Sequence, residues 1–360
     1  MEKYRFKLNE SVQIGKDSPT ALNVLIGANS EKQYWNECKK LEELNNCNLP
    51  ISIITDLSLY KKPGKELWRQ IVKDHRFVAG AVPIYQAVGP NKIVEPSYLL
   101  DIFHEQAECG VKLITIHPTP DLELLEMSKS RIVPITSRGG AAVSADMLIR
   151  QARENVYIKI IDDIINVAKS YCVTLSIGTS FRSANLRDAM DQTYLQELTK
   201  QLKIGNYCEQ RGVNVIIETP GHASPQNIFS ICDKLNACCP YPIMPLGPMP
   251  TDCALDQDDL AASIGAVLMG TRGCADILSV VTKDEHTGGI PTTETIVSAI
   301  KKYSVAKHII DIYKLNDTRN DDQISLERSN NTSCIMGTKQ ICNRCGELCP
   351  LNLAKDLKHN

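Results

Sequence analysis

The sequence predicts an α/β protein, a (β/α)8 barrel of the TIM type followed by a C-terminal arm that carries cysteines. Short β-branched apolar runs alternate with longer amphipathic segments along most of the chain. Most of these runs are continuously apolar, as in strands that are buried on both faces of a parallel sheet. Eight or nine β–α units within about 290 residues fit a barrel better than a doubly wound sheet. No GxGxxG motif follows a strand, so nothing supports a dinucleotide site.

The apolar runs place the expected strands in order along the chain. They cover residues 21–27, 51–58, 77–85, 111–117, 131–136, 172–178, 213–218, 242–247 and 275–281. Helical periodicity is clearest over residues 155–170, 189–210 and 294–314. Residues 1–20 form an N-terminal extension before the first strand, and the barrel is expected to span residues 21–314.

After residue 314 the composition changes. The segment LNDTRNDDQISLERSNNTS is polar and has little periodicity, which predicts a flexible arm over residues 315–360. The arm carries Cys342-x2-Cys345-x3-Cys349. Three thiolates at this spacing can hold three irons of a 4Fe-4S cluster and leave the fourth iron open. A zinc knuckle with Cys334 as fourth ligand is the alternative that the spacing leaves open.

Composition and charge exclude several classes of protein. The chain has 360 residues, of which 43% are apolar, and its 40 Lys and Arg against 42 Asp and Glu give a formal net charge of −2. Such a chain can bury a core, and its near neutrality argues against nucleic acid or a membrane as the main partner. It has no run of roughly 20 apolar residues and no signal-peptide stretch at its N-terminus. We therefore expect a soluble, cytoplasmic protein whose fourteen cysteines are mostly reduced.

Polar residues stand where the expected strands end, and in a barrel this is the end that carries the chemistry. Glu218 closes one strand and is followed by His222 in the segment ETPGH, while VTKDEH closes the last strand with His286. Two neutral imidazoles on different strand ends can share a divalent ion such as Zn²⁺ or Fe²⁺. The alternative, in which each histidine only hydrogen-bonds a loop, carries about equal weight. His117, which ends another strand, could bind substrate rather than metal.

The segment Ser137-Arg138-Gly139-Gly140 lies between an expected strand and a helix. Backbone N–H groups at a helix start, together with a serine hydroxyl and an arginine, suit a phosphate. A simple glycine turn with a capping serine is equally compatible with these residues. Arg182 in GTSFR could supply a second guanidinium to the same anion.

Together these motifs resemble the phosphomethylpyrimidine synthase (ThiC) family of thiamine biosynthesis and its paralogue, 5-hydroxybenzimidazole synthase. The resemblance covers about residues 20–290 and resumes at the terminal cysteines. It is carried by the segments TDLS (55–58), VPIYQA (82–87), EQAECGVKLITIH (105–117), SRGG (137–140), VTLSIG (173–178), IETPGH (217–222), LGPMPTD (246–252), IGAVLMG (264–270), GCA (273–275) and VTKDEHTGGIP (281–291).

The resemblance implies a radical lyase in which a 4Fe-4S cluster cleaves S-adenosyl-L-methionine. The implied reaction rearranges 5-aminoimidazole ribonucleotide into 4-amino-5-hydroxymethyl-2-methylpyrimidine phosphate. An electron donor such as flavodoxin or ferredoxin and a homodimer are implied as well. By position, the implied metal ligands are His222 and His286 for a mononuclear Zn²⁺ or Fe²⁺, and Cys342, Cys345 and Cys349 for the cluster. Glu218 is the implied catalytic residue, and the implied substrate contacts are Tyr85, His117, Ser137, Arg138, Gly139, Arg182 and Glu218.

Four positions depart from the family pattern. Leu25, Thr55, Thr179 and Met244 stand where the family has an Asn, a Met, a carboxylate and a Tyr, and the cysteine spacing is one residue shorter. Because polar contacts to a base and ribose discriminate strongly between substrates, benzimidazole synthesis for an anaerobic cobamide is a close alternative. A non-catalytic or partner paralogue and a zinc-only lyase or hydrolase with Glu218 as base are alternatives from other classes.

Overall fold

The computed structural model describes residues 3–74, 76–337, 342 and 344–359 of the chain. The chain divides into two compact units, Met1–Ile310 and Asp311–Asn360. None of the helices in the described residues is both long and apolar enough to cross a membrane.

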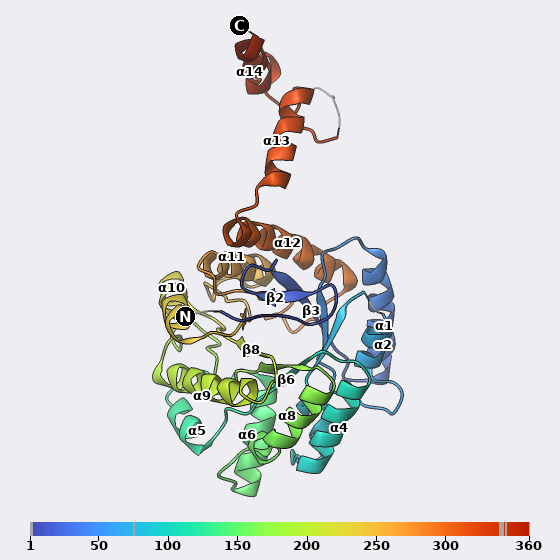
Figure 1. Cartoon of the computed structure of the whole chain (residues 1–360), viewed down its shortest axis with the longest axis vertical. Helices are drawn as coiled ribbons and strands as arrows, with labels where there is room; N and C mark the ends of the chain where they lie inside the picture. Colours follow the sequence, from blue (N-terminus) through green and yellow to red (C-terminus); the bar gives the residue numbers. More distant parts are fainter. Residues whose placement is uncertain (1–2, 75, 338–341, 343, 360) are drawn as a thin grey trace. The chain divides into compact units, whose positions relative to one another are not determined.

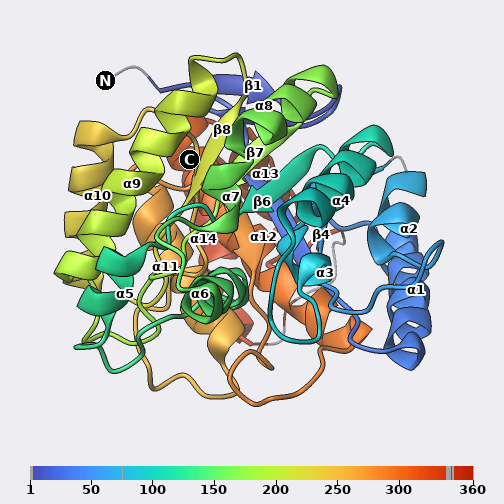
Figure 2. The ribbon, with the colours of Figure 1, turned by 90° about the horizontal axis from the view of Figure 1, so that it is seen from below.

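The first unit is a parallel barrel surrounded by helices, as the sequence predicts (Figure 1 and Figure 2). Its eight strands are hydrogen-bonded in the order β10-β3-β4-β5-β6-β7-β8-β9. They are β3 (Ala21–Ile26), β4 (Ile53–Asp56), β5 (Val78–Ala81), β6 (Leu113–Ile116), β7 (Thr174–Ile177), β8 (Val215–Glu218), β9 (Ile243–Met244) and β10 (Ile277–Val280).

The ring is joined between β9 and β10 through Asp276. The backbone N–H of Asp276 donates to the carbonyl of Ile243 at 2.9 Å. The side-chain Oδ2 of Asp276 accepts from the N–H of Ile243 at 2.9 Å. Strand β9 has only two residues. The backbone and side chain of Asp276 therefore supply hydrogen bonds that a longer strand would make with β10.

Helices cover the outside of the barrel, and α4 and α8 lie side by side in Figure 1. Several of these helices begin at a Ser, Asp or Asn whose side chain accepts a backbone N–H of the first turn, the residue types that stabilise helix starts. The helices are α1 (Glu31–Asn46), α2 (Leu67–Lys73), α3 (Ile84–Ala87), α4 (Pro96–Glu108), α5 (Leu122–Ser128), α6 (Arg138–Arg150), α7 (Val156–Lys159), α8 (Ile161–Ser170), α9 (Gln192–Glu209), α10 (Pro225–Cys238), α11 (Asp258–Gly270) and α12 (Thr293–Leu315).

The N-terminal extension forms a hairpin that the sequence does not predict. Strands β1 (Arg5–Lys7) and β2 (Gln13–Gly15) pair antiparallel. Leu8 and Ile14 pack in one buried cluster with residues of seven barrel strands. Most of those residues lie near the strand starts, so the hairpin covers the barrel end opposite the strand termini that carry the predicted site.

The predicted strand over residues 131–136 is wrong. The backbone N–H groups of Ile132 and Val133 donate to the carboxylate of Asp188 at 3.1 and 3.0 Å instead of to a neighbouring strand. Pro134 also lacks the N–H that a central strand needs. The segment is a loop that leads into α6.

The second unit contains helices where the sequence predicts an irregular arm. They are α13 (Arg319–Asn331), a 3₁₀ turn (Gly346–Leu348) and α14 (Pro350–His359). No residue of α13 is buried. A helix that buries no face needs no apolar stripe. The sequence therefore lacks the amphipathic period from which this helix could have been predicted.

Candidate active site

A cavity of about 560 Å³ opens at the carboxyl ends of the strands. Five of the predicted site residues line it, namely Tyr85, Arg138, Arg182, His222 and His286. They come from the loops and helix starts that follow five different strands. In a barrel this face is where loops of separate strands converge, so residues far apart in sequence share one cavity.

The start of α6 and two arginines form a positively charged corner of the cavity, which we name the anion corner. Ser137 caps α6, since its Oγ accepts the N–H of Gly140 at 2.8 Å. The guanidinium of Arg138 lies 4.8 Å from the ring centre of Tyr85. Arg182 also lines the cavity, and its Nη1 donates to the carbonyl of Thr179 at 3.2 Å. Two cations beside a helix N-terminus suit a phosphate.

Tyr85 is half-buried in this corner. Burial raises the pKa of the Tyr85 hydroxyl, although the nearby Arg138 and Arg182 oppose this rise. The hydroxyl therefore stays protonated at neutral pH and can donate a hydrogen bond.

His117 lies behind the anion corner and is not among the residues that line the cavity. A Cβ on Gly139 would lie 2.3 Å from the His117 ring, so only glycine lets α6 approach it this closely. Burial lowers the pKa of His117 to about 3, which keeps the imidazole neutral. Its Nδ1 has no hydrogen-bond partner in the part of the chain that the structure describes.

Glu218 lies inside the barrel, 5% exposed, at the end of β8. Its Oε1 accepts from the hydroxyls of Thr115 at 2.9 Å and Ser176 at 2.8 Å. These two residues belong to β6 and β7, so two other strands of the barrel hold the carboxylate in place. Like Ser137 and Gly139, it lies outside the residues that line the cavity.

His222 and His286 lie next to each other, with ring centres 5.2 Å apart and ring planes at 69°. Metal–nitrogen bonds of about 2.1 Å at a tetrahedral angle put two imidazole centres about 5 Å apart, so the pair fits one shared ion. Nδ1 of each ring lies against an aspartate, His222 against Asp252 at 2.7 Å and His286 against Asp258 at 2.9 Å. Within the described residues no three His, Cys, Asp or Glu side chains form a metal-binding group, so water or substrate would complete the coordination.

Comparison with known proteins decides the family. The model of the radical SAM ThiC family matches residues 2–337. The chain belongs to this family. Proteins named phosphomethylpyrimidine synthase are similar over nearly the whole length: that of Thermodesulfovibrio yellowstonii is 33% identical over 95% of this chain and 87% of its own. That of Sulfurisphaera tokodaii is 31% identical over 99% of this chain and 88% of its own.

This ThiC family member is therefore an enzyme of the radical SAM type. Membership of that family implies a 4Fe-4S cluster and S-adenosylmethionine as cofactors. The three arm cysteines predicted to hold the cluster are free thiols in the second unit. Cys342 and Cys349 are half-buried and Cys345 is exposed. Neighbouring residues of the motif lie outside the described part of the chain, so the ligand set stays a prediction.

Of the four departures from the family pattern, Leu25 alone is among the residues that line the cavity. The hydroxyl of Thr55 donates to Oδ1 of Asn23 at 2.8 Å, and Nδ2 of Asn23 points to the sulfur of Met244 at 3.7 Å. The hydroxyl of Thr179 donates to Glu197 at 2.5 Å. The polar atoms of both threonines are thus used within the protein rather than toward a ligand.

Glu197 is a residue that the sequence analysis missed. It lies on α9, is 1% exposed, and accepts four hydrogen bonds of 2.5 to 2.8 Å. Three of the donors are in residues 179–181, directly before Arg182. Glu197 therefore anchors the loop that presents the second arginine, and no motif marks it because its partners come from elsewhere in the chain.

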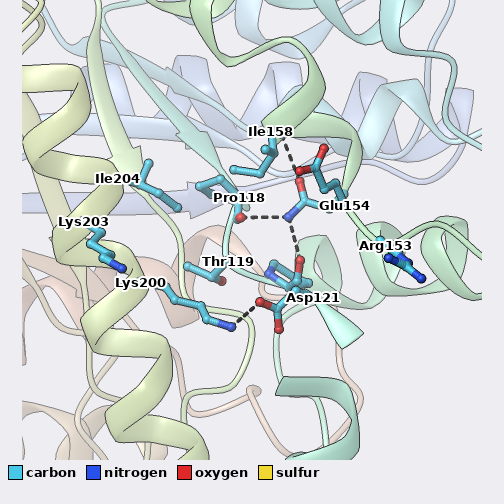
Figure 3. Close-up of a pocket in the computed structure, with 11 residues that line it drawn as sticks. Pro118, Thr119, Asp121, Arg153, Glu154, Ile158, Lys200, Lys203 and Ile204 are labelled. Carbon is cyan, nitrogen blue, oxygen red and sulfur yellow. Dashed lines mark hydrogen bonds and ion pairs between the residues drawn. The ribbon is translucent and has the colours of Figure 1, made fainter. Parts of the chain in front are cut away.

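A second cavity, of about 270 Å³, lies between α9 and the loop that follows β6 (Figure 3). It contains none of the predicted site residues. Figure 3 shows Lys200 reaching Asp121, with which it forms an ion pair. This pairing offsets the charge of Lys200, and we assign no function to the cavity.

Proposed function

We propose that the chain is a radical S-adenosylmethionine lyase that rearranges 5-aminoimidazole ribonucleotide to 4-amino-5-hydroxymethyl-2-methylpyrimidine phosphate. One observation carries this proposal. In a member of the radical SAM ThiC family, a single cavity joins a two-arginine anion corner to a pair of adjacent histidines. A phosphorylated substrate would thus place its ring between its phosphate grip and a metal ion.

The anion corner would bind the substrate phosphate. Arg138 and Arg182 supply positive charge, and the start of α6 supplies backbone N–H donors. The protonated Tyr85 hydroxyl would donate a further hydrogen bond. Gly139 would contribute through its backbone N–H, and its lack of a side chain lets His117 pack directly against the start of the helix.

His222 and His286 would hold the mononuclear Zn²⁺ or Fe²⁺, which supplies Lewis-acid stabilisation of negative charge. Glu218 is the proposed catalytic residue. Its Oε1 is occupied by the hydroxyls of Thr115 and Ser176, whereas its Oε2 has no hydrogen bond in the described residues. Oε2 is therefore the atom that would take a proton from the substrate.

Cys342, Cys345 and Cys349 would hold the 4Fe-4S cluster, whose open iron supports reductive cleavage of S-adenosylmethionine. An external electron donor such as flavodoxin or ferredoxin would reduce it.

We further propose a homodimer in the cytoplasm. Size-exclusion chromatography with light scattering tests the oligomeric state. A measured mass equal to that of a single chain would contradict the homodimer.

The test is anaerobic reconstitution with iron and sulfide, followed by reduction and addition of S-adenosylmethionine and 5-aminoimidazole ribonucleotide. We expect 5′-deoxyadenosine and the pyrimidine phosphate in the product masses, and a cluster EPR signal that changes with S-adenosylmethionine. A folded protein that binds only zinc and forms no 5′-deoxyadenosine would overturn the radical proposal and favour the non-catalytic paralogue or the zinc-only barrel.

A second candidate activity is 5-hydroxybenzimidazole synthesis from the same substrate. The observation that favours it is Leu25, which lines the cavity where the family pattern has an amide. An apolar side chain there removes one polar contact that could orient the substrate. The same assay separates the two activities, because the second product has a different mass.

A further inference from the structure

Each of the two adjacent histidines is paired with its own aspartate. Nδ1 of His222 lies 2.7 Å from Oδ1 of Asp252, and Nδ1 of His286 lies 2.9 Å from Oδ1 of Asp258. A carboxylate oxygen can only accept a hydrogen bond, so each Nδ1 carries a proton. Both rings are therefore held in the tautomer whose Nε2 has a free lone pair, the form that binds a metal.

Asp252 is itself fixed by the loop that carries the second arginine. Its Oδ2 accepts the backbone N–H of Leu186 at 2.9 Å. The backbone of His222 joins the same loop, because its N–H donates to the carbonyl of Ser183 at 2.9 Å and the Ser183 hydroxyl donates to its carbonyl. Gly221 permits this approach, since a Cβ there would lie 2.3 Å from the Ser183 oxygen.

Asp258 is placed differently, in the first turn of α11 with a side chain only 2% exposed. Its Oδ2 is buried and has no hydrogen-bond partner in the described residues. A buried carboxylate with an unused oxygen is unfavourable for folding unless another interaction offsets it. Its Oδ1 pairs with Nδ1 of His286, a side chain that is itself 45% exposed.

We propose that Asp252 and Asp258 are positioning residues that orient Nε2 of His222 and His286 toward one divalent ion. The inference rests on the proposed metal site and adds two residues to it. Hydrogen bonds to the second nitrogen of a ligating histidine typically change metal affinity by about 10–100-fold when they are removed.

The experiment is a Co²⁺ titration of the full-length, metal-free protein, followed by the absorption bands of bound Co²⁺. We expect Asp252→Ala and Asp258→Ala each to raise the Kd for Co²⁺ by about 10–100-fold. Asp252→Asn and Asp258→Asn should recover part of the affinity, because an amide oxygen still accepts from Nδ1. The matched control is Asp256→Asn, an exposed carboxylate of the same segment that pairs with Lys283 and should bind as the wild type does.

Two results would overturn the inference, and they are distinguishable from failure of the metal site itself. If His222→Ala and His286→Ala weaken Co²⁺ binding but the aspartate variants do not, the positioning role is wrong while the metal site stands. If affinity falls only in parallel with the Tm of the metal-free variants, without recovery in the Asn variants, the aspartates are merely structural. If the two histidine variants bind as tightly as the wild type, the metal site is wrong and the inference falls with it.

Discussion

At the scale of single residues, the site depends on groups whose charge is set by burial. His117 is 2% exposed and lies between Gly139 and Gly178. Because burial disfavours the protonated ring, its pKa falls to about 3, whereas an unfolded histidine has a pKa near 6.5. The unfolded chain therefore binds a proton that the folded protein does not, over the range between these values.

This difference predicts that the folded protein loses stability as the pH is lowered through this range. Between pH 7 and pH 5 the free energy of unfolding of the wild type should drop by about 2 kcal/mol more than that of His117→Gln. Urea denaturation at several pH values measures both. The control is His104→Gln, a histidine with an exposed side chain, which should keep the pH dependence of the wild type. Equal slopes for the wild type and His117→Gln would show that the ring protonates in the folded state.

Glu197 gives a second prediction at this scale. Burial raises the pKa of its carboxyl, and four donors oppose that rise. Glu197→Gln places an amide N–H₂ against a backbone N–H of Ser180 or Phe181. Two donors then meet, because a backbone N–H cannot rotate to become an acceptor, whereas a threonine hydroxyl can. We expect a loss of about 1–3 kcal/mol in unfolding free energy and weaker phosphate binding.

Denaturant titration and calorimetry with inorganic phosphate measure these two effects. Glu123→Gln is the control, since its carboxylate is 62% exposed and pairs with Lys200 at the surface, where such pairs contribute about 0–1 kcal/mol. A Glu197→Gln variant as stable as the wild type would mean that the loop does not depend on this carboxylate.

At the scale of elements, the start of α6 is shaped by its contact with the loop after β7. A Cβ on Gly140 would lie 2.4 Å from the Cβ of Ser180 and 2.7 Å from its Cα. This loop also accepts the N–H of Thr136 at the carbonyl of Ser180. The two segments that carry Arg138 and Arg182 therefore pack directly on one another.

Gly140→Ala should consequently destabilise the protein, although alanine is favoured over glycine in a helix by about 1 kcal/mol. We expect a loss of about 1–3 kcal/mol from overpacking, with weaker phosphate binding, as read by denaturation and calorimetry. Ala142→Gly in the same helix should lose about 1 kcal/mol and keep its phosphate affinity. A gain in stability for Gly140→Ala would contradict the close packing.

At the scale of the whole molecule, the proposed chemistry draws on both compact units. The histidines and arginines belong to Met1–Ile310, and the cysteine motif belongs to Asp311–Asn360. A change in the cysteine motif should therefore affect the reaction without affecting the barrel core.

Cys345→Ala tests this division. We expect formation of 5′-deoxyadenosine to fall at least about 100-fold with the Tm of the barrel unchanged, because the cluster would lose one of three thiolates. Cys253→Ala, another exposed cysteine, should keep both activity and bound iron. Undiminished turnover by Cys345→Ala would contradict the radical proposal and favour the zinc-only lyase or hydrolase, which needs no cluster.

The sequence by itself determined the barrel, and it indicated several of the polar residues at the barrel mouth. Continuous apolar runs predicted all eight barrel strands, since local burial on both faces leaves a local pattern. Strand ends also indicated His222 and His286, and the structure brings their rings to 5.2 Å. The parallel topology alone makes such ends converge.

Only the tertiary structure decided which polar groups are free and which are used internally. Asp188, Glu197 and Asp258 form hydrogen bonds with segments that are distant in the chain. No residue spacing in the sequence therefore predicts their roles. Asp188 takes the backbone donors that would have made residues 131–136 a strand, and Glu197 takes the hydroxyl of Thr179. Hydrogen-bond partners are chosen by proximity in the fold, whereas a sequence pattern records only which face of each element is buried.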